Sequence, residues 1–210
     1  MSVRKTATGC GNLATRSTFH YDRIQRVFHW SMAATIFTAI ALGIWALYLD
    51  RDSPIKGSLL FVHKSLGLTV LILVIARVAY SLIVGKPPYR QPLHRFNQVG
   101  STTAHLLLYG LMILMPVTGY VFTGAGGHPL PFYGLFEWPS IVPKDKALSQ
   151  LAGAFHYWGA WAICSVLIVH ILAVVWHSLA KRDEILGRML PTMSNPSPRY
   201  PPAETVELKS

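Results

Sequence analysis

The sequence is poor in charge: only 13% of its 210 residues are Asp, Glu, Lys or Arg, while 51% are hydrophobic. A soluble domain usually carries about 25% charged residues. Between Ala147 and Ala180 there is no charged residue at all. These deficits argue against a soluble domain and indicate a protein embedded in a lipid bilayer.

Cysteine is also scarce. Cys10 lies in a polar N-terminal stretch and Cys164 in the middle of an apolar run, so we expect no disulfide between them. The sequence contains no C-x-x-C-H motif, which excludes the usual covalent attachment of haem. Residues 1–21 lack an apolar segment, and we therefore expect no cleaved signal peptide.

Four apolar runs are long enough to cross a bilayer core of about 30 Å. They cover residues 28–49, 59–84, 104–123 and 151–177. The modest connections between them predict one all-α domain, an integral membrane four-helix bundle over residues 21–191. Residues 1–20 form a polar N-terminal tail in this division, and residues 192–210, rich in Pro and polar side chains, are expected to be disordered.

Basic residues predict the orientation of the bundle. Five of them precede the first run, against Asp22 alone, and the connection after the second run holds Lys86, Arg90 and Arg95 without an acidic residue. In the other two connections basic and acidic residues balance. Both termini are therefore expected in the cytoplasm. The same pattern, with attraction to anionic lipid, explains the net charge of +10, so we expect no nucleic-acid binding.

The third connection, residues 124–143, is the longest and combines a Gly-Gly-His-Pro sequence with several aromatic residues. Aromatic rings with a polar edge favour the membrane–water interface, so we expect this loop to anchor the outer face. A lid over a binding site is the alternative.

Histidines lie at matching depths in different runs. His156 and His170 are fourteen residues apart, so both face the bundle interior near opposite ends of the fourth run, about 21 Å from each other. His29 begins the first run at the inner side, and His63 begins the second at the outer side. The sequence thus predicts two pairs: His29 with His170, and His63 with His156.

Each pair joins two helices at one level, as axial ligation of a six-coordinate haem iron requires. Zinc is the alternative metal, but structural zinc sites usually have four ligands, often cysteines at short spacing. We therefore predict two non-covalent b haems, held by His29, His63, His156 and His170. Because two histidine ligands leave no open position on the iron, electron transfer is favoured over oxygen binding.

Further residues fit these pairs. Arg77 follows His63 by fourteen residues and is expected at the inner pair, where it either binds a haem propionate or extends to the inner membrane surface. Gly43 and Gly67 would let a planar ring approach the backbone, although small residues also serve helix packing. His105 begins the third run at the inner side, where it either hydrogen bonds a propionate or a quinone, or simply packs.

The ordered set of motifs resembles the bacterial cytochrome b561 family, which is related to the cytochrome b subunits of hydrogenases. The matching segments, within residues 21–191, are R-V-F-H-W at His29, F-V-H-K-S-L-G at His63, A-H-L-L-L-Y-G at His105, A-F-H-Y-W-G at His156 and G-R-M-L-P at residues 187–191. This resemblance implies a four-helix cytochrome with two b haems in the bacterial inner membrane, with the same four histidine ligands. It also implies electron transfer between a quinone, such as ubiquinone, and a second redox partner.

Three functions are compatible with these patterns. The first is a self-standing quinone-linked oxidoreductase, of which superoxide oxidation with ubiquinone reduction is the form that the resemblance suggests. The second is a cytochrome b membrane-anchor subunit of a larger hydrogenase or dehydrogenase. The third, a transporter or proton relay that uses the histidines, is disfavoured because only Pro116 interrupts a run near mid-membrane.

Overall fold

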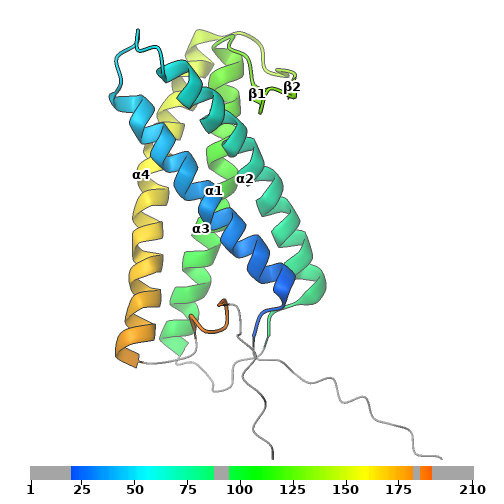
Figure 1. Ribbon diagram of the computed structural model, residues 1–210, viewed down its shortest axis with the longest axis vertical. Coiled ribbons are helices and arrows are strands. Elements are labelled where there is room, and N and C mark those ends of the chain that lie inside the picture. The colour runs from blue at the N-terminus through cyan, green and yellow to red at the C-terminus, as the bar shows by residue number, and fades with distance from the viewer. Residues whose placement is uncertain (1–19, 88–94, 182–184, 191–210) are drawn as a thin grey trace, which may run out of the picture.

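The computed structural model describes residues 20–87, 95–181 and 185–190. Four long helices dominate it (Figure 1): α1 (Arg23–Tyr48), α2 (Lys56–Val84), α3 (Arg95–Ala125) and α4 (Lys146–Trp176), the last continuing as a short π-helix, η1 (His177–Lys181). Two short strands, β1 (Pro131–Phe132) and β2 (Phe136–Glu137), lie between α3 and α4. The predicted all-α four-helix bundle is confirmed.

Each of the four helices is long and apolar enough to cross a membrane. The predicted spans are thereby confirmed, and the chain is a multi-pass membrane protein. Most of the apolar side chains on the helices are exposed, because lipid rather than protein surrounds them. The two expected tails lie outside the described residues except for His20 at the N-terminal side, so their boundaries stay predictions, as does the cytoplasmic placement of both termini.

Helix ends follow from local sequence. Asp22 and Asp145 precede α1 and α4, and each carboxylate accepts a hydrogen bond at 2.8 Å from a backbone amide of the first turn. α2 ends at Gly85, whose φ of 79° lies in the left-handed region that glycine adopts without strain. Pro116 lies inside α3 without ending it. All four helices begin before the apolar runs from which they were predicted, and α3 also ends after its run.

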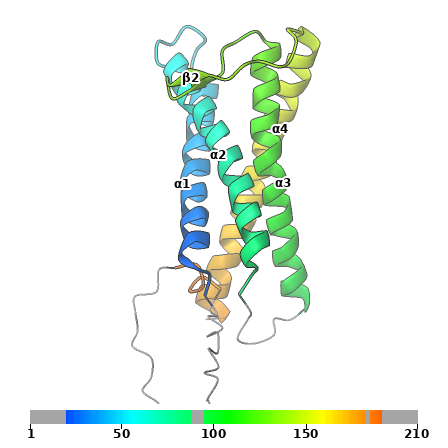
Figure 2. The same cartoon turned by 90° about the vertical axis from the view of Figure 1, so that its right-hand side faces the viewer.

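The bundle consists of two helix pairs, α1 with α2 and α3 with α4, which meet mainly through α2 and α3. Figure 2 shows the two pairs side by side. The core lies midway along the bundle and draws on all four helices: Met32, Ile36, Val70, Val74, Leu108, Met112 and Ile163. We call the end that carries β1 and β2 the hairpin end, and the opposite end, where α1 begins, the terminal end.

The third connection forms a β-hairpin that is docked on α2. β1 and β2 pair antiparallel, with Phe132 opposite Phe136. The fully buried Ser65 hydroxyl accepts a hydrogen bond from the Tyr133 amide at 3.0 Å, and its proton is shared between the carbonyls of Pro131, at 3.2 Å, and of Phe61 on the same helix, at 3.0 Å. Ser65 lies two residues after His63, so the hairpin is fixed close to one of the predicted ligands.

The hairpin also exposes the aromatic and apolar side chains on which the expectation of an interfacial anchor was based. Tyr133, Leu135, Phe136 and Trp138 are all exposed, and Phe136 contacts the Trp138 ring. Such a surface is typical of a segment at the membrane–water interface. The interfacial position itself stays a prediction.

Candidate functional site

The two histidines at the hairpin end face each other. His63 comes from α2 and His156 from α4. Their ring centres are 6.0 Å apart and their ring planes are nearly perpendicular, at 87°. The sequence-derived pairing by depth therefore matches the arrangement of these two residues.

A backbone carbonyl of α1 orients His63. The Nδ1 atom of His63 lies 2.9 Å from the Ala39 carbonyl oxygen, and because a carbonyl can only accept, Nδ1 carries the proton and donates. One turn further along α1, Gly43 lies against the ring: a Cβ atom there would be 3.0 Å from Cε1 of His63. Any larger residue at Gly43 would displace the imidazole.

His156 is held in the same way by α3. Its Nδ1 atom donates to the Met115 carbonyl at 3.0 Å and lies 3.2 Å from Oγ1 of Thr118. Gly119, four residues after Met115, would bring a Cβ atom to 3.1 Å from Cε1 of the His156 ring. Each helix pair thus supplies a carbonyl, and four residues later a glycine, to one imidazole. The carbonyls could not be found from the sequence, because every residue has one.

This arrangement leaves the same atom free on both rings. With the proton on Nδ1, Nε2 keeps its lone pair, which is the protonation state that metal ligation requires. Two metal–nitrogen bonds of about 2 Å would place the nitrogens roughly 4 Å apart, with the ring centres farther back along the same line. The observed separation of 6.0 Å between ring centres fits one metal ion between the rings. His63 and His156 therefore suit the two axial positions of a haem iron.

At the terminal end, four residues gather rather than two. His170 of α4 contacts His105 of α3, with ring centres 5.4 Å apart and planes at 86°. His29 of α1 lies at the same end and hydrogen bonds to Arg77 of α2. The structure thus places both members of the predicted His29–His170 pair at one end, but the ring in contact with His170 is that of His105.

The protonation states of these rings differ. Nδ1 of His105 lies 2.6 Å from the Ser101 carbonyl and must donate to it, which leaves Nε2 free. Nδ1 of His29 lies 2.9 Å from Nη1 of Arg77, and since a guanidinium can only donate, this Nδ1 accepts. A neutral His29 ring therefore carries its proton on Nε2. The pairing of His29 with His170 stays a prediction.

Arg77 points into the bundle and not towards the membrane surface. Besides its bond to His29, Nη1 lies 3.9 Å from the Met32 sulfur, and the guanidinium is 5.9 Å from the ring centre of Tyr109. The alternative that Arg77 extends to the inner membrane surface is therefore wrong for this conformation. The predicted place of Arg77, beside the terminal-end histidines, is confirmed.

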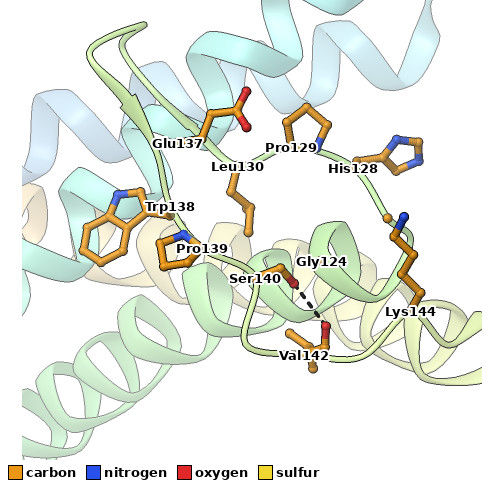
Figure 3. Close-up of a pocket in the computed structure, with 11 residues that line it drawn as sticks. Gly124, His128, Pro129, Leu130, Glu137, Trp138, Pro139, Ser140, Val142 and Lys144 are labelled. Atoms are coloured by element: carbon orange, nitrogen blue, oxygen red, sulfur yellow. Dashed lines mark hydrogen bonds between the residues drawn. The ribbon is translucent and has the colours of Figure 1, made fainter.

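Among the described residues, hollows also lie outside the histidine pairs. The first, of about 620 Å³, lies between the hairpin and the ends of α3 and α4; in Figure 3 Leu130 points into it, with His128 and Lys144 on one side and Trp138 on another. The second, of about 820 Å³, is an open apolar groove on α4 and η1 that begins at Val169, next to His170.

The remaining residues singled out in the sequence take ordinary positions. A Cβ atom at Gly67 would meet nothing within 4 Å, so this glycine faces open space. Cys164 is a free thiol. Within the described ranges, no three side chains of His, Cys, Asp or Glu come together in a way that could hold a metal ion. Among these residues there is therefore no four-ligand set of the kind that structural zinc uses.

Comparison with known proteins agrees with these findings. The sequence model of a family described as prokaryotic cytochrome b561 matches residues 20–192. Cytochrome b561 homolog 2 of Escherichia coli (strain K12) is 28% identical over 177 residues, which cover 84% of this chain and 94% of the relative. The Probable superoxide oxidase CybB of Yersinia pestis is 28% identical over 175 residues, 81% of this chain and 96% of the relative.

A third relative is named as a subunit of a hydrogenase. The Probable Ni/Fe-hydrogenase B-type cytochrome subunit of Rhizobium leguminosarum bv. viciae is 24% identical over 236 residues, covering 90% of this chain and 95% of the relative. All three relatives are matched over nearly their whole length.

Proposed function

We propose that two haems are bound by this chain, which belongs to the prokaryotic cytochrome b561 family and is a membrane electron-transfer protein that binds b-type haem. The chain would pass electrons between a quinone and a second redox partner. His63 and His156 would hold the haem at the hairpin end, and His29 and His170 the haem at the terminal end. Each haem would supply a reversible one-electron change at its iron.

The geometry of His63 and His156 carries this proposal. Both imidazoles are oriented by backbone carbonyls, both keep Nε2 free, and their ring centres are 6.0 Å apart. Gly43 and Gly119 make the room that the rings need. The two fixed imidazoles would both hold the haem iron, and the haem would then supply electron transfer without binding of a substrate to the metal.

At the terminal end, Arg77 must change its contact for His29 to bind through Nε2. Ligation would move the His29 proton to Nδ1, and the Arg77 guanidinium cannot accept it. Arg77 would then be released for an anionic group, and a haem propionate is the anion that this site would supply. His105, already in contact with His170 and with Nε2 free, is the second candidate for the ligand opposite His170.

The groove on α4 supports a lipid-soluble partner such as ubiquinone. It is lined by side chains of α4 and η1 that are mostly apolar and exposed, and it begins at Val169, one residue before His170. A quinone that diffuses in the bilayer could reach the terminal-end haem from this groove without crossing an aqueous phase.

Charge supports the orientation. Arg23, Arg26, Arg95 and Lys181 lie at the terminal end, whereas Arg51 at the hairpin end is flanked by Asp50 and Asp52. By the excess of basic residues on the cytoplasmic side, the terminal end would face the cytoplasm of a bacterial inner membrane. The hairpin end would then face the periplasm, where a small anion such as superoxide could enter the cavity beside His128 and Lys144, which Glu137 also lines.

A subunit role is the second candidate, because the hydrogenase cytochrome relative matches 90% of the chain. In that case the exposed hairpin would contact a larger redox protein. The two functions differ in a simple measurement: a subunit would co-purify with its partner and reduce quinone slowly alone, whereas a self-standing oxidoreductase would reduce quinone with a soluble donor.

The test of the proposal is the haem content of the purified protein in detergent. Quantified per chain, we expect two b haems, both low-spin, and reduction of added ubiquinone after the haems are reduced. One haem per chain, or a high-spin signal at full loading, would overturn the assignment of two bis-histidine sites.

A further inference from the structure

A short C-terminal segment, residues 185–190, folds back against the start of α1. Its backbone carbonyls accept four hydrogen bonds from that helix and the residues before it, one of them from Nδ1 of His20 to Gly187 at 3.3 Å. Nη1 of Arg26 donates to Leu190 at 2.7 Å, Nε1 of Trp30 donates to Met189 at 2.9 Å, and the Tyr21 amide donates to Arg188 at 3.3 Å. Figure 1 shows this segment beneath the bundle, at the terminal end.

Arg188 fixes the segment to a second part of the chain. Its side chain is only 6% exposed. Nη2 donates to the Pro87 carbonyl at 2.6 Å, just after α2, and the guanidinium is 5.3 Å from the centre of the Tyr21 ring. A buried guanidinium is costly unless its donors are engaged, so these contacts hold the segment in one place.

The bond from Trp30 links the segment to the proposed haem ligand. The Trp30 indole lies against the His29 ring, with ring centres 5.3 Å apart and planes at 80°. Its N–H is the only hydrogen-bonding group of the indole, and the Met189 carbonyl satisfies it. With that bond in place the indole is held in one orientation, and its edge-on contact restricts the rotation of His29.

We propose that residues 185–190 are a positioning element for the terminal-end haem: Met189 holds Trp30, and Trp30 sets the orientation of the His29 ring. The inference rests on the proposed ligation by His29. The plane of an axial imidazole and its contacts tune the electronic state of the iron, so a change at Met189 or Trp30 alters the haem spectrum without removal of a ligand.

The first test is Trp30→Phe, which keeps an aromatic ring beside His29 but removes the N–H that binds Met189. In the purified holoprotein we expect shifted low-spin electron paramagnetic resonance signals and a shifted midpoint potential for one haem only, with two haems per chain retained. Trp45→Phe is the matched control, because Trp45 is an exposed side chain in the half of α1 nearest the hairpin end, and this change should alter neither haem. Unchanged spectra in Trp30→Phe, or equal shifts in both haems, would overturn the proposal.

The second test removes the acceptor instead of the donor. A chain that ends at Glu184 lacks the whole segment, whereas one that ends at Leu190 keeps it. We expect the shorter chain to show the Trp30→Phe shift and the longer one to match the full chain. Combination of Trp30→Phe with the shorter chain should add nothing, since both changes break one link. Additive shifts would contradict the link. If the shorter chain does not retain haem, the Arg188→Met variant of the full chain is tested in its place, and we expect the same spectral shift. An unchanged haem spectrum in Arg188→Met would overturn the proposal.

His29→Ala separates this inference from the proposed function. If the variant keeps both haems, His29 is not a ligand, and both the assignment and the positioning role fail. If it loses one haem while Trp30→Phe has no effect, only the positioning role fails.

Discussion

His63 and His156 belong to different halves of the bundle, yet their ring centres are 6.0 Å apart with perpendicular planes. Nδ1 of His63 donates to the Ala39 carbonyl of α1, and Nδ1 of His156 donates to the Met115 carbonyl of α3. Each ring is thus held by the neighbouring helix of its own pair. The orientation of each ring is therefore set by the packing within its helix pair, and docking of the two pairs brings the two imidazole rings together.

His63→Ala should remove the haem at the hairpin end and leave the other. The reason is that one axial ligand is lost while the terminal-end residues are untouched. We expect haem per chain to fall from two to one, with the remaining signal low-spin. His128→Ala, in the hairpin-end loop, is the control and should retain both haems. Loss of both haems from a folded His63→Ala protein would contradict separate sites.

Gly43→Ala and Gly119→Ala should weaken haem retention at the hairpin end. An added Cβ would lie 3.0 or 3.1 Å from Cε1 of a ligand ring, so the imidazole must move. Overpacking of this kind usually costs about 1–3 kcal/mol. The measurement is the temperature at which the haem absorbance is lost, which should fall in both variants. Gly110→Ala on α3, where a Cβ would meet nothing within 4 Å, should not lower it.

The terminal end is decided by a comparison of His29→Ala with His105→Ala. We expect the first to lose one haem and the second to keep both, with only a shifted spectrum. The opposite result would make His105 the ligand opposite His170, as their present ring contact would suggest.

Arg77→Gln should alter the terminal-end haem alone. The cation next to a propionate favours the more negative, reduced state of the site, so its removal should lower the midpoint potential of that haem. Redox titration followed by absorbance would show one of the two transitions moved. A rise in that potential, or movement of the hairpin-end transition, would contradict the proposed place of Arg77.

Ser65→Ala should loosen the hairpin. The buried hydroxyl accepts from the amide of Tyr133 and shares its proton between Pro131 and Phe61, and a buried amide left without its acceptor costs about 1–3 kcal/mol. We expect faster proteolytic cleavage within residues 128–138. Ser165→Ala is the matched control, because that hydroxyl bonds only to a carbonyl one turn earlier on its own exposed helix face. Equal cleavage in the two variants would argue against the docking role of Ser65.

The sequence predicted the bundle well because apolar length and histidine depth are both periodic properties of helices. The spans, the His63–His156 pair and the place of Arg77 follow from counting residues along each run. The docking of the hairpin on Ser65 and the fold-back of residues 185–190 do not, because their hydrogen bonds go to backbone atoms that every residue possesses. At the terminal end, His29, His105 and His170 share one level, and depth alone cannot choose the partners among three.

The division of the bundle has a consequence for biogenesis. The half formed by α1 and α2 and the half formed by α3 and α4 each contribute one imidazole to the hairpin-end site, and they adhere to each other less extensively than the helices within a half. A haem held by His63 and His156 would join the two halves of the bundle. Binding of the haem and association of the halves would then be thermodynamically coupled. Cells short of haem would then accumulate a chain whose halves are inserted but only loosely joined, and therefore open to membrane proteases.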